Sequence, residues 1–412
     1  MAWLPRTLET TLHRVLRTFP ALVVTGPRQS GKTSLLRRIG RSTHAFVSLE
    51  DTDRRQLAAA DPRRFLRDHP PPLIVDEIQY APDLLSYIKT AIDQDRKPGR
   101  WLMSGSQPFA VMRGVTQSLA GRVAVLELLP LSCNEAAGSP HGDRTIGDLL
   151  ARLQEPEGHL RRIRGHQAPN LANWLVRGGY PEPRANRSID HRQWCASYVR
   201  TYVERDVRTL LRVGDLNDFE RFLRLCAART GQILNLSDLA RETGISVPTA
   251  RSWLSVLEAS YTVFLLQPYF RNIGKRLIKA PKLYFIDTAL ATYLTGLDEE
   301  RTALRGPTAG ALVETAIVGG WRKAFVHRGE TPRMYYWRTR DGLEIDLLIE
   351  HAGQLHPIEI KATSTVTPGH AASLLRWLAE MGDRTRRGVV FADIPAPVSL
   401  HERVQAVPWH WI

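Results

Sequence analysis

The stretch Ala21–Leu36, ALVVTGPRQSGKTSLL, decides the fold of the chain around it. Its first apolar residues predict a buried strand, and a helical pattern follows directly after Thr33. Between strand and helix, residues 26–33 match G-x-x-x-x-G-K-[ST], the phosphate-binding P-loop. Because strand, loop and helix stand in the order that this motif requires, we predict an α/β core that binds a nucleotide.

The residue types in this loop indicate how it would hold phosphate. Gly26 and Gly31 let the backbone wrap a phosphate, and the loop N–H groups together with the helix start attract anions. Lys32 is expected to reach the β- and γ-phosphate oxygens, and Thr33 to ligate Mg²⁺. ATP and Mg²⁺ are therefore the expected cofactors. The expected nucleotide-contacting residues are Gly26, Pro27, Arg28, Gln29, Ser30, Gly31, Lys32, Thr33 and Ser34.

A second motif lies in residues 72–77, PLIVDE, where an apolar strand leads into two adjacent carboxylates. At the end of a buried parallel strand, Asp76 can hold Mg²⁺ beside the P-loop, and Glu77 can orient or deprotonate the attacking water. Two acids at this place could instead cap the helix that begins near Pro82. A further strand at Trp101–Met103 ends in SGSQ (104–107), where a polar side chain senses the γ-phosphate or merely forms a turn.

Length and composition limit the number of domains and the classes of partner and site that the chain can have. With 412 residues the chain should form two or three domains, and its net charge of +14 favours a phosphate-rich partner such as DNA, the alternative being an arginine-rich solvated surface. The three cysteines lack C-x-x-C spacing, which argues against a structural zinc site and a disulfide framework. Since no segment is apolar over the length of a bilayer, we expect a soluble cytoplasmic protein without a membrane partner.

Taken together, GPRQSGKT, LIVDEIQ, the strand ending in SGSQ, and SLAGRV (118–123) resemble a bacterial and archaeal family of AAA-type ATPases. In that family the ATPase is followed by a C-terminal domain of unknown function related to PD-(D/E)xK nucleases. The resemblance covers nearly the whole chain. It implies an AAA-type ATPase core over residues 1–130 and a helical lid with a linker helix over 131–215.

The same resemblance suggests an arginine finger. AAA-type ATPases commonly place an arginine of one subunit against the γ-phosphate held by its neighbour, where it stabilises charge in the transition state. Arg122 is the candidate, with Arg113 as a competitor, and the alternative is an ordinary surface arginine. Arg205 or Arg208 in the linker helix could sense phosphate as well, although a solvated helix face is favoured there. A finger acting between subunits implies a homo-oligomer.

Residues 216–300 show the pattern of a winged helix-turn-helix. Three helical patterns, with Ser237 and Ser246 as expected N-caps and a turn at Gly244, precede a strand at 261–267 and a returning strand at 282–286. The alternative to DNA contact is a fold used only for packing between subunits. The residues predicted to contact DNA are Thr249, Arg251 and Ser252 on the recognition helix and Arg271, Lys275 and Arg276 on the wing.

Residues 301–412 hold a second chemical constellation. A helical Glu314 precedes a strand with Asp346 and a strand with Glu359 and Lys361, the order of a PD-(D/E)xK nuclease core. The three carboxylates are the predicted metal ligands, and Lys361 would orient or deprotonate the attacking water. Alternatively, the domain is a binding or structural module whose carboxylates pair with Arg338 or Arg340.

The predicted fold is thus α/β, with an AAA-type ATPase core, a helical lid, a winged helix-turn-helix and a C-terminal PD-(D/E)xK nuclease-like domain. The leading hypothesis is a Mg²⁺-dependent ATPase that acts on DNA, with metal-dependent DNA cleavage by the C-terminal domain. The alternative is an ATP-gated regulatory switch that binds nucleic acid or protein through a non-catalytic nuclease-like domain.

Overall fold

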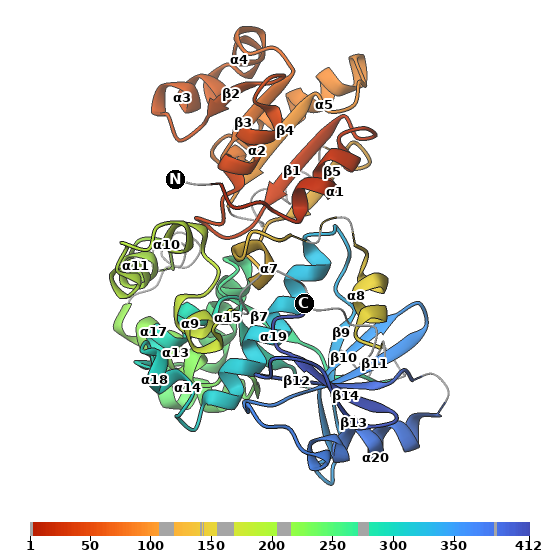
Figure 1. Ribbon diagram of the computed structural model, residues 1–412. Helices are drawn as coiled ribbons and strands as arrows, with labels where there is room; N and C mark the ends of the chain where they lie inside the picture. The colour runs from red at the N-terminus through yellow and green to blue at the C-terminus, as the bar shows by residue number, and fades with distance from the viewer. Residues whose placement is uncertain are drawn as a thin grey trace.

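The computed structural model describes residues 3–106, 119–140, 142, 144–154, 169–203, 216–270, 280–382 and 385–412. The N-terminal part, at the top of Figure 1, is a five-stranded sheet in the order β2-β3-β4-β1-β5, and every neighbouring pair is parallel. Its strands are β1 (Ala21–Thr25), β2 (Ala45–Ser48), β3 (Leu73–Asp76), β4 (Trp101–Gly105) and β5 (Val123–Glu127). Because the strands are parallel, the P-loop after β1 and the carboxylates at the end of β3 meet at one edge.

Helices cover both faces of this sheet. One core lies between the sheet and α1 with α2, and a second lies between the sheet and α3, α4 and α5. The elements are α1 (Leu8–Val15), α2 (Lys32–Gly40), α3 (Thr52–Ala60), α4 (Pro62–Asp68), the 3₁₀ turn η1 (Ile78–Tyr80) and α5 (Leu84–Gln94). The three strands predicted before the P-loop, before Asp76 and at Trp101–Met103 are therefore found as β1, β3 and β4, whereas β5 was not expected as a strand.

Short helices follow the sheet, as the sequence predicted for the region after residue 130. They are α7 (Cys133–Ala136), α8 (Ile146–Arg152), α9 (Leu171–Arg177), α10 (Pro181–Ala185), α11 (His191–Tyr198) and the π-helical turn η3 (Val199–Val203). Arg205 and Arg208 lie outside the described residues, as does Arg113.

The next segment forms the predicted helices and an antiparallel strand pair. Its elements are α13 (Leu216–Ala228), β6 (Gln232–Ile233), α14 (Leu236–Thr243), α15 (Val247–Ala259), β7 (Val263–Leu266), β8 (Lys282–Phe285), α17 (Thr288–Thr295) and α18 (Glu300–Ala303). Ser246 caps α15 as predicted, because its side chain accepts from the Thr249 N–H. Ser237 does not cap α14: it lies inside the helix, and Asn235 is the cap. The predicted wing residues Arg271, Lys275 and Arg276 lie outside the described residues.

The C-terminal part is a six-stranded mixed sheet in the order β13-β14-β12-β11-β10-β9. Cores on its two faces contain residues of α19 on one side and α20 on the other. The elements are α19 (Ala309–Val326), β9 (Met334–Arg338), β10 (Glu344–His351), β11 (Gln354–Ile360), η4 (Pro368–Ala371), α20 (Ala372–Met381), β12 (Gly388–Ala392), β13 (Val398–His401) and β14 (Val404–Pro408).

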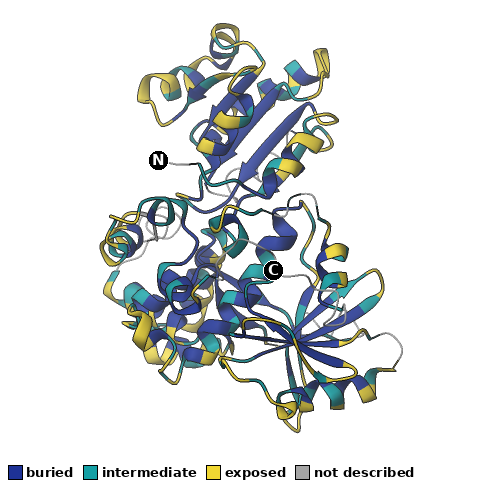
Figure 2. Ribbon diagram, viewed as in Figure 1, coloured by how far each residue is buried: buried dark blue, intermediate teal, exposed yellow. Residues whose placement is uncertain are grey.

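One hydrophobic core joins the parts that follow the N-terminal sheet. It extends from Leu129 to Trp409 and includes residues of α9, α13, α15, α17 and α19. The chain after β7 also pairs with β9, because Pro268 bridges to Tyr336 and the Tyr269 N–H donates to Tyr336 O at 2.7 Å. In Figure 2 the strands of both large sheets are mostly buried and the outer faces of α3, α4 and α20 are exposed. Within the described ranges, no helix combines the length and apolarity needed to cross a bilayer.

Candidate functional site

The P-loop adopts the backbone that its glycines were predicted to allow. Gly26 and Gly31 have φ angles of 143° and 93°, and a Cβ atom at Gly26 would lie 2.2 Å from Leu128 O. Lys32 extends back along the loop, where its Nζ donates to Gly26 O at 3.0 Å and Pro27 O at 2.8 Å. The ammonium group therefore lies inside the loop, at the position where a bound phosphate would need a positive charge.

Thr33 and Asp76 meet at the start of α2. Thr33 Oγ1 donates to Asp76 Oδ1 at 2.8 Å, and Ser104 Oγ donates to the same oxygen. Burial raises the pKa of Asp76, against the lowering effect of these two hydroxyl groups. A hydroxyl and a carboxylate in contact beside a P-loop fit a shared Mg²⁺ ion, because hard oxygen ligands suit this hard cation.

Glu77 follows Asp76 with a left-handed backbone, φ 57°, and its side chain is buried. Both carboxylate oxygens accept from Ser106 Oγ, at 2.8 Å and 2.9 Å, and one also accepts from the Gln79 amide. Its side chain makes no capping hydrogen bond to the turn that follows. The helix that begins after Pro82 is α5, and Asp83 stands at its N-cap, so neither Asp76 nor Glu77 takes that position. A γ-phosphate-sensing role for a polar side chain after β4 stays a prediction. Gln107 lies outside the described residues.

Two adjoining cavities lie over this edge of the sheet. The first, of about 450 Å³, is lined by P-loop residues from Arg28 to Ser34, by Glu50, Glu77 and Ser106, and by Pro181 and Glu182. The second is smaller, about 180 Å³, and mainly apolar, with Trp3, Leu4 and Leu131 among its lining residues. The cavities share Gly31, Ser34 and Pro181. A polar space for phosphates therefore adjoins an apolar one that can take a flat base.

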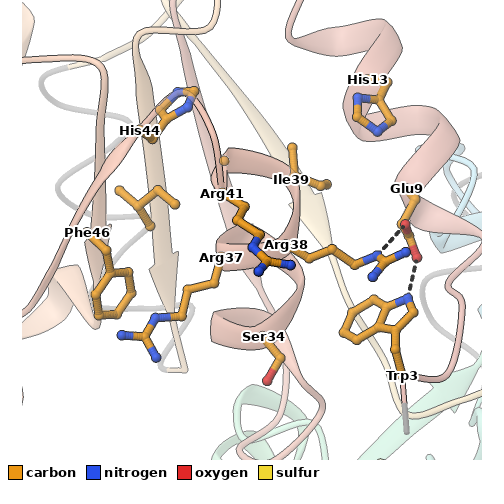
Figure 3. Close-up of a pocket in the computed structure, with 12 residues that line it drawn as sticks. Trp3, Glu9, His13, Ser34, Arg37, Arg38, Ile39, Arg41, His44 and Phe46 are labelled. Atoms are coloured by element: carbon orange, nitrogen blue, oxygen red, sulfur yellow. Dashed lines mark hydrogen bonds and ion pairs between the residues drawn. The ribbon is translucent and has the colours of Figure 1, made fainter.

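Glu9 and Arg38 contact the side chain of Trp3, as Figure 3 shows. Its indole Nε1 donates to Glu9 Oε1 at 3.2 Å, and the Arg38 guanidinium carbon lies 5.0 Å from the centre of its ring. Arg38 Nε also lies 3.6 Å from Glu9 Oε2. The N-terminal segment is thereby fixed to the P-loop helix α2, with Trp3 at the wall of the apolar cavity.

A buried ion network ties the P-loop to the rest of the molecule. Arg6 donates to Ser30 O at 2.8 Å and to Leu129 O at 2.6 Å, and its Nε lies 3.4 Å from Glu135 Oε1. The same oxygen lies 3.2 Å from Nδ1 of His327, the residue that follows α19. Burial alone would raise the pKa of Glu135, but Arg6 and His327 lower it well below its usual range.

Arg122 does not line the nucleotide cavity of its own chain. It forms a two-point ion pair with Asp93 of α5, with Nε at 2.5 Å from one oxygen and Nη2 at 3.1 Å from the other. Because it precedes β5, it lies at the sheet edge opposite the P-loop. The finger hypothesis thus stays a prediction, and it can apply only between subunits.

The three predicted contact residues on α15 lie together near the start of that helix. Arg251 is exposed, and Thr249 and Ser252 are partly exposed. Thr249 Oγ1 is 2.7 Å from Ser246 Oγ, the capping hydroxyl. These positions are accessible to a partner, and their contact with DNA stays a prediction.

Glu314 lies on α19 beside a lysine that sequence reasoning missed. Lys282 of β8 is buried, and its Nζ lies 2.8 Å from Glu314 Oε1 and 2.6 Å from Glu344 Oε1. Tyr284 OH also donates to Glu314 Oε1, at 2.5 Å. Burial and the charge of Asp346 raise the pKa of Glu314, against the lowering effect of Lys282.

The other members of the predicted nuclease-like set lie at neighbouring strand ends. Asp346 Oδ2 accepts from the Ile360 N–H at 2.8 Å, and Lys361 Nζ donates to Glu359 Oε1 at 2.6 Å. The second oxygen of Glu359 is buried without a hydrogen-bond partner. Burial and the charge of Asp346 raise the pKa of Glu359.

We name the carboxylates of Glu314, Asp346 and Glu359 the acidic cluster. It differs from the predicted metal site in how these groups are arranged. Across the part of the chain that is described, no three His, Cys, Asp or Glu side chains are grouped so that they could hold a metal ion. Lys282 supplies a positive charge to Glu314 where a metal ion was expected to do so. A Mg²⁺ site at Glu314, Asp346 and Glu359 therefore stays a prediction, and the structure offers an ion-paired alternative to it. Arg338 also pairs with a carboxylate, at 3.3 Å, but its partner is Glu344 and not one of the three predicted metal ligands.

Comparison with known proteins agrees with the geometry of the N-terminal site. Residues 18–137 match the model of an AAA domain. Residues 168–301 and 309–412 match two domains of unknown function, DUF8612 and DUF4143. The chain therefore carries a P-loop ATPase core of the AAA type.

Two relatives align with most of the chain. Uncharacterized proteins of Mycobacterium tuberculosis (Rv2008c) and Mycobacterium bovis (Mb2031c) are each 32% identical over 357 residues, which cover 86% of this chain and 73% of the relative. Among solved structures, the Walker-type ATPase PABY2304 of Pyrococcus abyssi aligns with 71% of this chain and 96% of its own, at 14% identity and a TM-score of 0.44.

Proposed function

The chain belongs to the same family as the two mycobacterial proteins, and we propose that it is a Mg²⁺-dependent ATP hydrolase that acts on DNA. The observation that carries the hydrolase assignment is the set of groups around one cavity of about 450 Å³. Around this cavity, one edge of the parallel sheet presents the P-loop lysine and the Thr33 hydroxyl in contact with the Asp76 carboxylate. The same edge presents the Glu77 carboxylate, which Ser106 holds.

Each of these groups has a role in phosphoryl transfer to water. Lys32 neutralises the phosphate oxygens of the bound nucleotide, and the loop N–H groups hold them. Glu77 positions the attacking water and accepts its proton, while Ser106 holds the carboxylate through both of its oxygens. Thr33 and Asp76 would hold Mg²⁺, which neutralises charge on the phosphates when it is bound.

The apolar cavity supports a purine nucleotide as the substrate. It shares Gly31 with the polar cavity, so a ligand can place phosphates in one and a base in the other. Trp3 offers an aromatic ring at its wall, and aromatic rings stack well on bases.

The hydrolase assignment is tested by nucleotide binding and phosphate release in matched variants. Glu77→Gln should bind ATP and release phosphate at least about a hundredfold more slowly, because the water loses its base. Glu380→Gln, at an exposed glutamate of α20 outside this cavity, is the control and should release phosphate at the parental rate. Parental turnover in Glu77→Gln would show that Glu77 is not the base.

Action on DNA is supported by the charge of +14 and by the exposed Arg251 at the start of α15. Duplex DNA should accelerate ATP hydrolysis if the nucleotide cycle drives work on DNA. A rate that duplex DNA leaves unchanged would favour the alternative, an ATP-gated switch for a protein partner.

For the acidic cluster, the contact of Lys282 with Glu314 and Glu344 favours a module that does not cut DNA. Supercoiled and linear DNA should therefore remain intact with Mg²⁺ or Mn²⁺, with or without ATP. Cleavage by the parent that is lost in both Glu359→Ala and Lys361→Ala would contradict this and establish a metal-dependent nuclease.

A further inference from the structure

A cavity of about 900 Å³ lies between α8 and one edge of the C-terminal sheet, away from both sites above. Arginine and histidine side chains dominate its polar lining, and among the described residues that line it none is an aspartate or glutamate. The basic residues are His351, His356, Arg386, Arg387 and Arg403. We name this set the basic cavity.

Sheet topology explains why these residues meet. Strands β11, β12 and β14 are parallel neighbours, so the residues that precede them lie at one edge of the sheet. Arg386 and Arg387 come directly before β12, and Arg403 comes directly before β14. Glu359 and Lys361 lie at the far end of β11, so the basic cavity and the acidic cluster occupy opposite edges of the same sheet.

Backbone contacts hold the arginines at this edge. The Arg386 N–H donates to Leu355 O at 3.0 Å, and the Gly388 N–H donates to Arg403 O at 2.9 Å. Arg387 Nη2 donates to the backbone oxygen of Glu402 at 2.6 Å. In the described ranges none of the three guanidinium groups is ion-paired with a carboxylate, in contrast to exposed Arg376, which pairs with Asp341 at 2.9 Å.

His356 adds a buried polar atom to the cavity wall. It is 8% exposed, and its Nδ1 has no hydrogen-bond partner among the described residues. Burial and the charges of His351 and Arg386 lower the pKa of His356 to about 4. The imidazole is therefore neutral at pH 7 and adds no charge to the cavity wall.

We propose that the basic cavity binds the phosphate backbone of a nucleic acid. The three arginines stand at the starts of two neighbouring parallel strands, β12 and β14, which lie about 4.8 Å apart, so their guanidinium groups can contact adjacent phosphates of one nucleic-acid strand. Arginine presents two parallel N–H groups to phosphate oxygens, a geometry that holds each phosphate in register. This site is separate from the predicted contacts on α15, and it does not depend on ATP hydrolysis.

Binding of fluorescein-labelled 20-nucleotide single strands and duplexes, followed by anisotropy, tests the proposal. The triple variant Arg386→Ala, Arg387→Ala, Arg403→Ala should weaken binding about tenfold or more near 0.15 M salt. It should also reduce the slope of log K against log salt by about 2 to 3, because about three phosphate contacts are lost.

The matched control replaces three exposed arginines of α3 and α4, Arg54, Arg63 and Arg67, by alanine. It removes the same net charge, so its affinity should fall less than threefold. An equal loss in the two triple variants, or parental affinity in the first, would overturn the proposal. ATP hydrolysis without DNA should be parental in both triple variants, which shows that they are folded.

Competition separates the basic cavity from sites for other anions. Inorganic tripolyphosphate and poly-glutamate should displace the oligonucleotide only when their concentration of negative charges is much higher than that of the oligonucleotide. Displacement at equal concentration by tripolyphosphate would indicate a site for small phosphate compounds, and displacement by poly-glutamate would indicate one for acidic protein segments. Either result would overturn the nucleic-acid assignment.

Discussion

Ser106 Oγ lies 2.8 Å and 2.9 Å from the two carboxylate oxygens of Glu77. The serine directly follows β4 and the glutamate directly follows β3, so two neighbouring parallel strands fix the direction of one carboxylate. Because this contact positions the group that we assign as the base, it should matter for turnover more than for nucleotide binding.

Ser106→Ala should lower kcat for ATP hydrolysis about tenfold and leave the affinity for ATP within about twofold, because a freed Glu77 spends less time oriented toward the water. Ser106→Thr, which keeps the hydroxyl, should recover most of the rate. An unchanged kcat in Ser106→Ala, or no recovery in Ser106→Thr, would contradict the proposal that Ser106 positions Glu77.

Trp3→Ala should raise the KM for ATP about tenfold and change kcat little, because the ring lines the apolar cavity and not the phosphate cavity. Binding of tripolyphosphate, which has no base, should be unaffected. Phe19→Ala is a suitable control, since Phe19 is an exposed aromatic residue elsewhere in the N-terminal part. Equal loss of ATP and tripolyphosphate binding would assign Trp3 to folding of the P-loop and not to the base.

Arg122→Ala should abolish turnover in a homogeneous assembly if the arginine acts on a neighbouring subunit. Mixing it with Lys32→Ala subunits should then restore part of the activity, because a mixed assembly can contain intact sites. No recovery in mixtures that are shown to co-assemble would leave Arg122 as the ion-pair partner of Asp93.

The lowered pKa of buried His356 predicts that the stability of the protein depends on pH. Its pKa falls from 6.5 to about 4 on folding, so the unfolded chain binds more protons between these values and stability is lost as the pH falls through this window. The loss attributable to His356 is about 2 kcal/mol between pH 7 and pH 5. His356→Gln should therefore show a smaller decrease in thermal midpoint over this range than the parent. The exposed His401→Gln should follow the parent, and a decrease in His356→Gln equal to that of the parent would contradict the assignment.

Motifs with a fixed order predicted which residues meet at one edge of the N-terminal sheet. A P-loop needs a strand, glycines, a lysine and a hydroxyl within one short stretch, and Asp76 with Glu77 follows an apolar strand, so their meeting at one sheet edge follows from parallel pairing. The strand β5 was missed because its first residue, Val123, is the last residue of SLAGRV, which was interpreted as a family motif and not as the turn and start of a strand.

Contacts between distant segments could not be predicted in this way. Lys282 reaches Glu314 and Glu344 from β8, and Trp3 and Arg6 reach the P-loop from the first residues, with no motif to mark these pairings. Lys282 did carry a signal, since a lysine beginning the apolar strand KLYF has to find an acidic partner if the strand is buried. The N-cap of α14 was assigned to Ser237 because two competent residues lie close together, and Asn235 takes the role.

Steady-state phosphate release from ATP with Mg²⁺, in the parent, Lys32→Ala and the surface control Lys97→Ala, tests the central claim most directly. We predict that Lys32→Ala loses at least about a hundredfold in rate, because the phosphates lose the charge that the loop holds in place, while Lys97→Ala hydrolyses ATP at the parental rate. Parental turnover in Lys32→Ala would contradict the assignment of this chain as a P-loop ATP hydrolase.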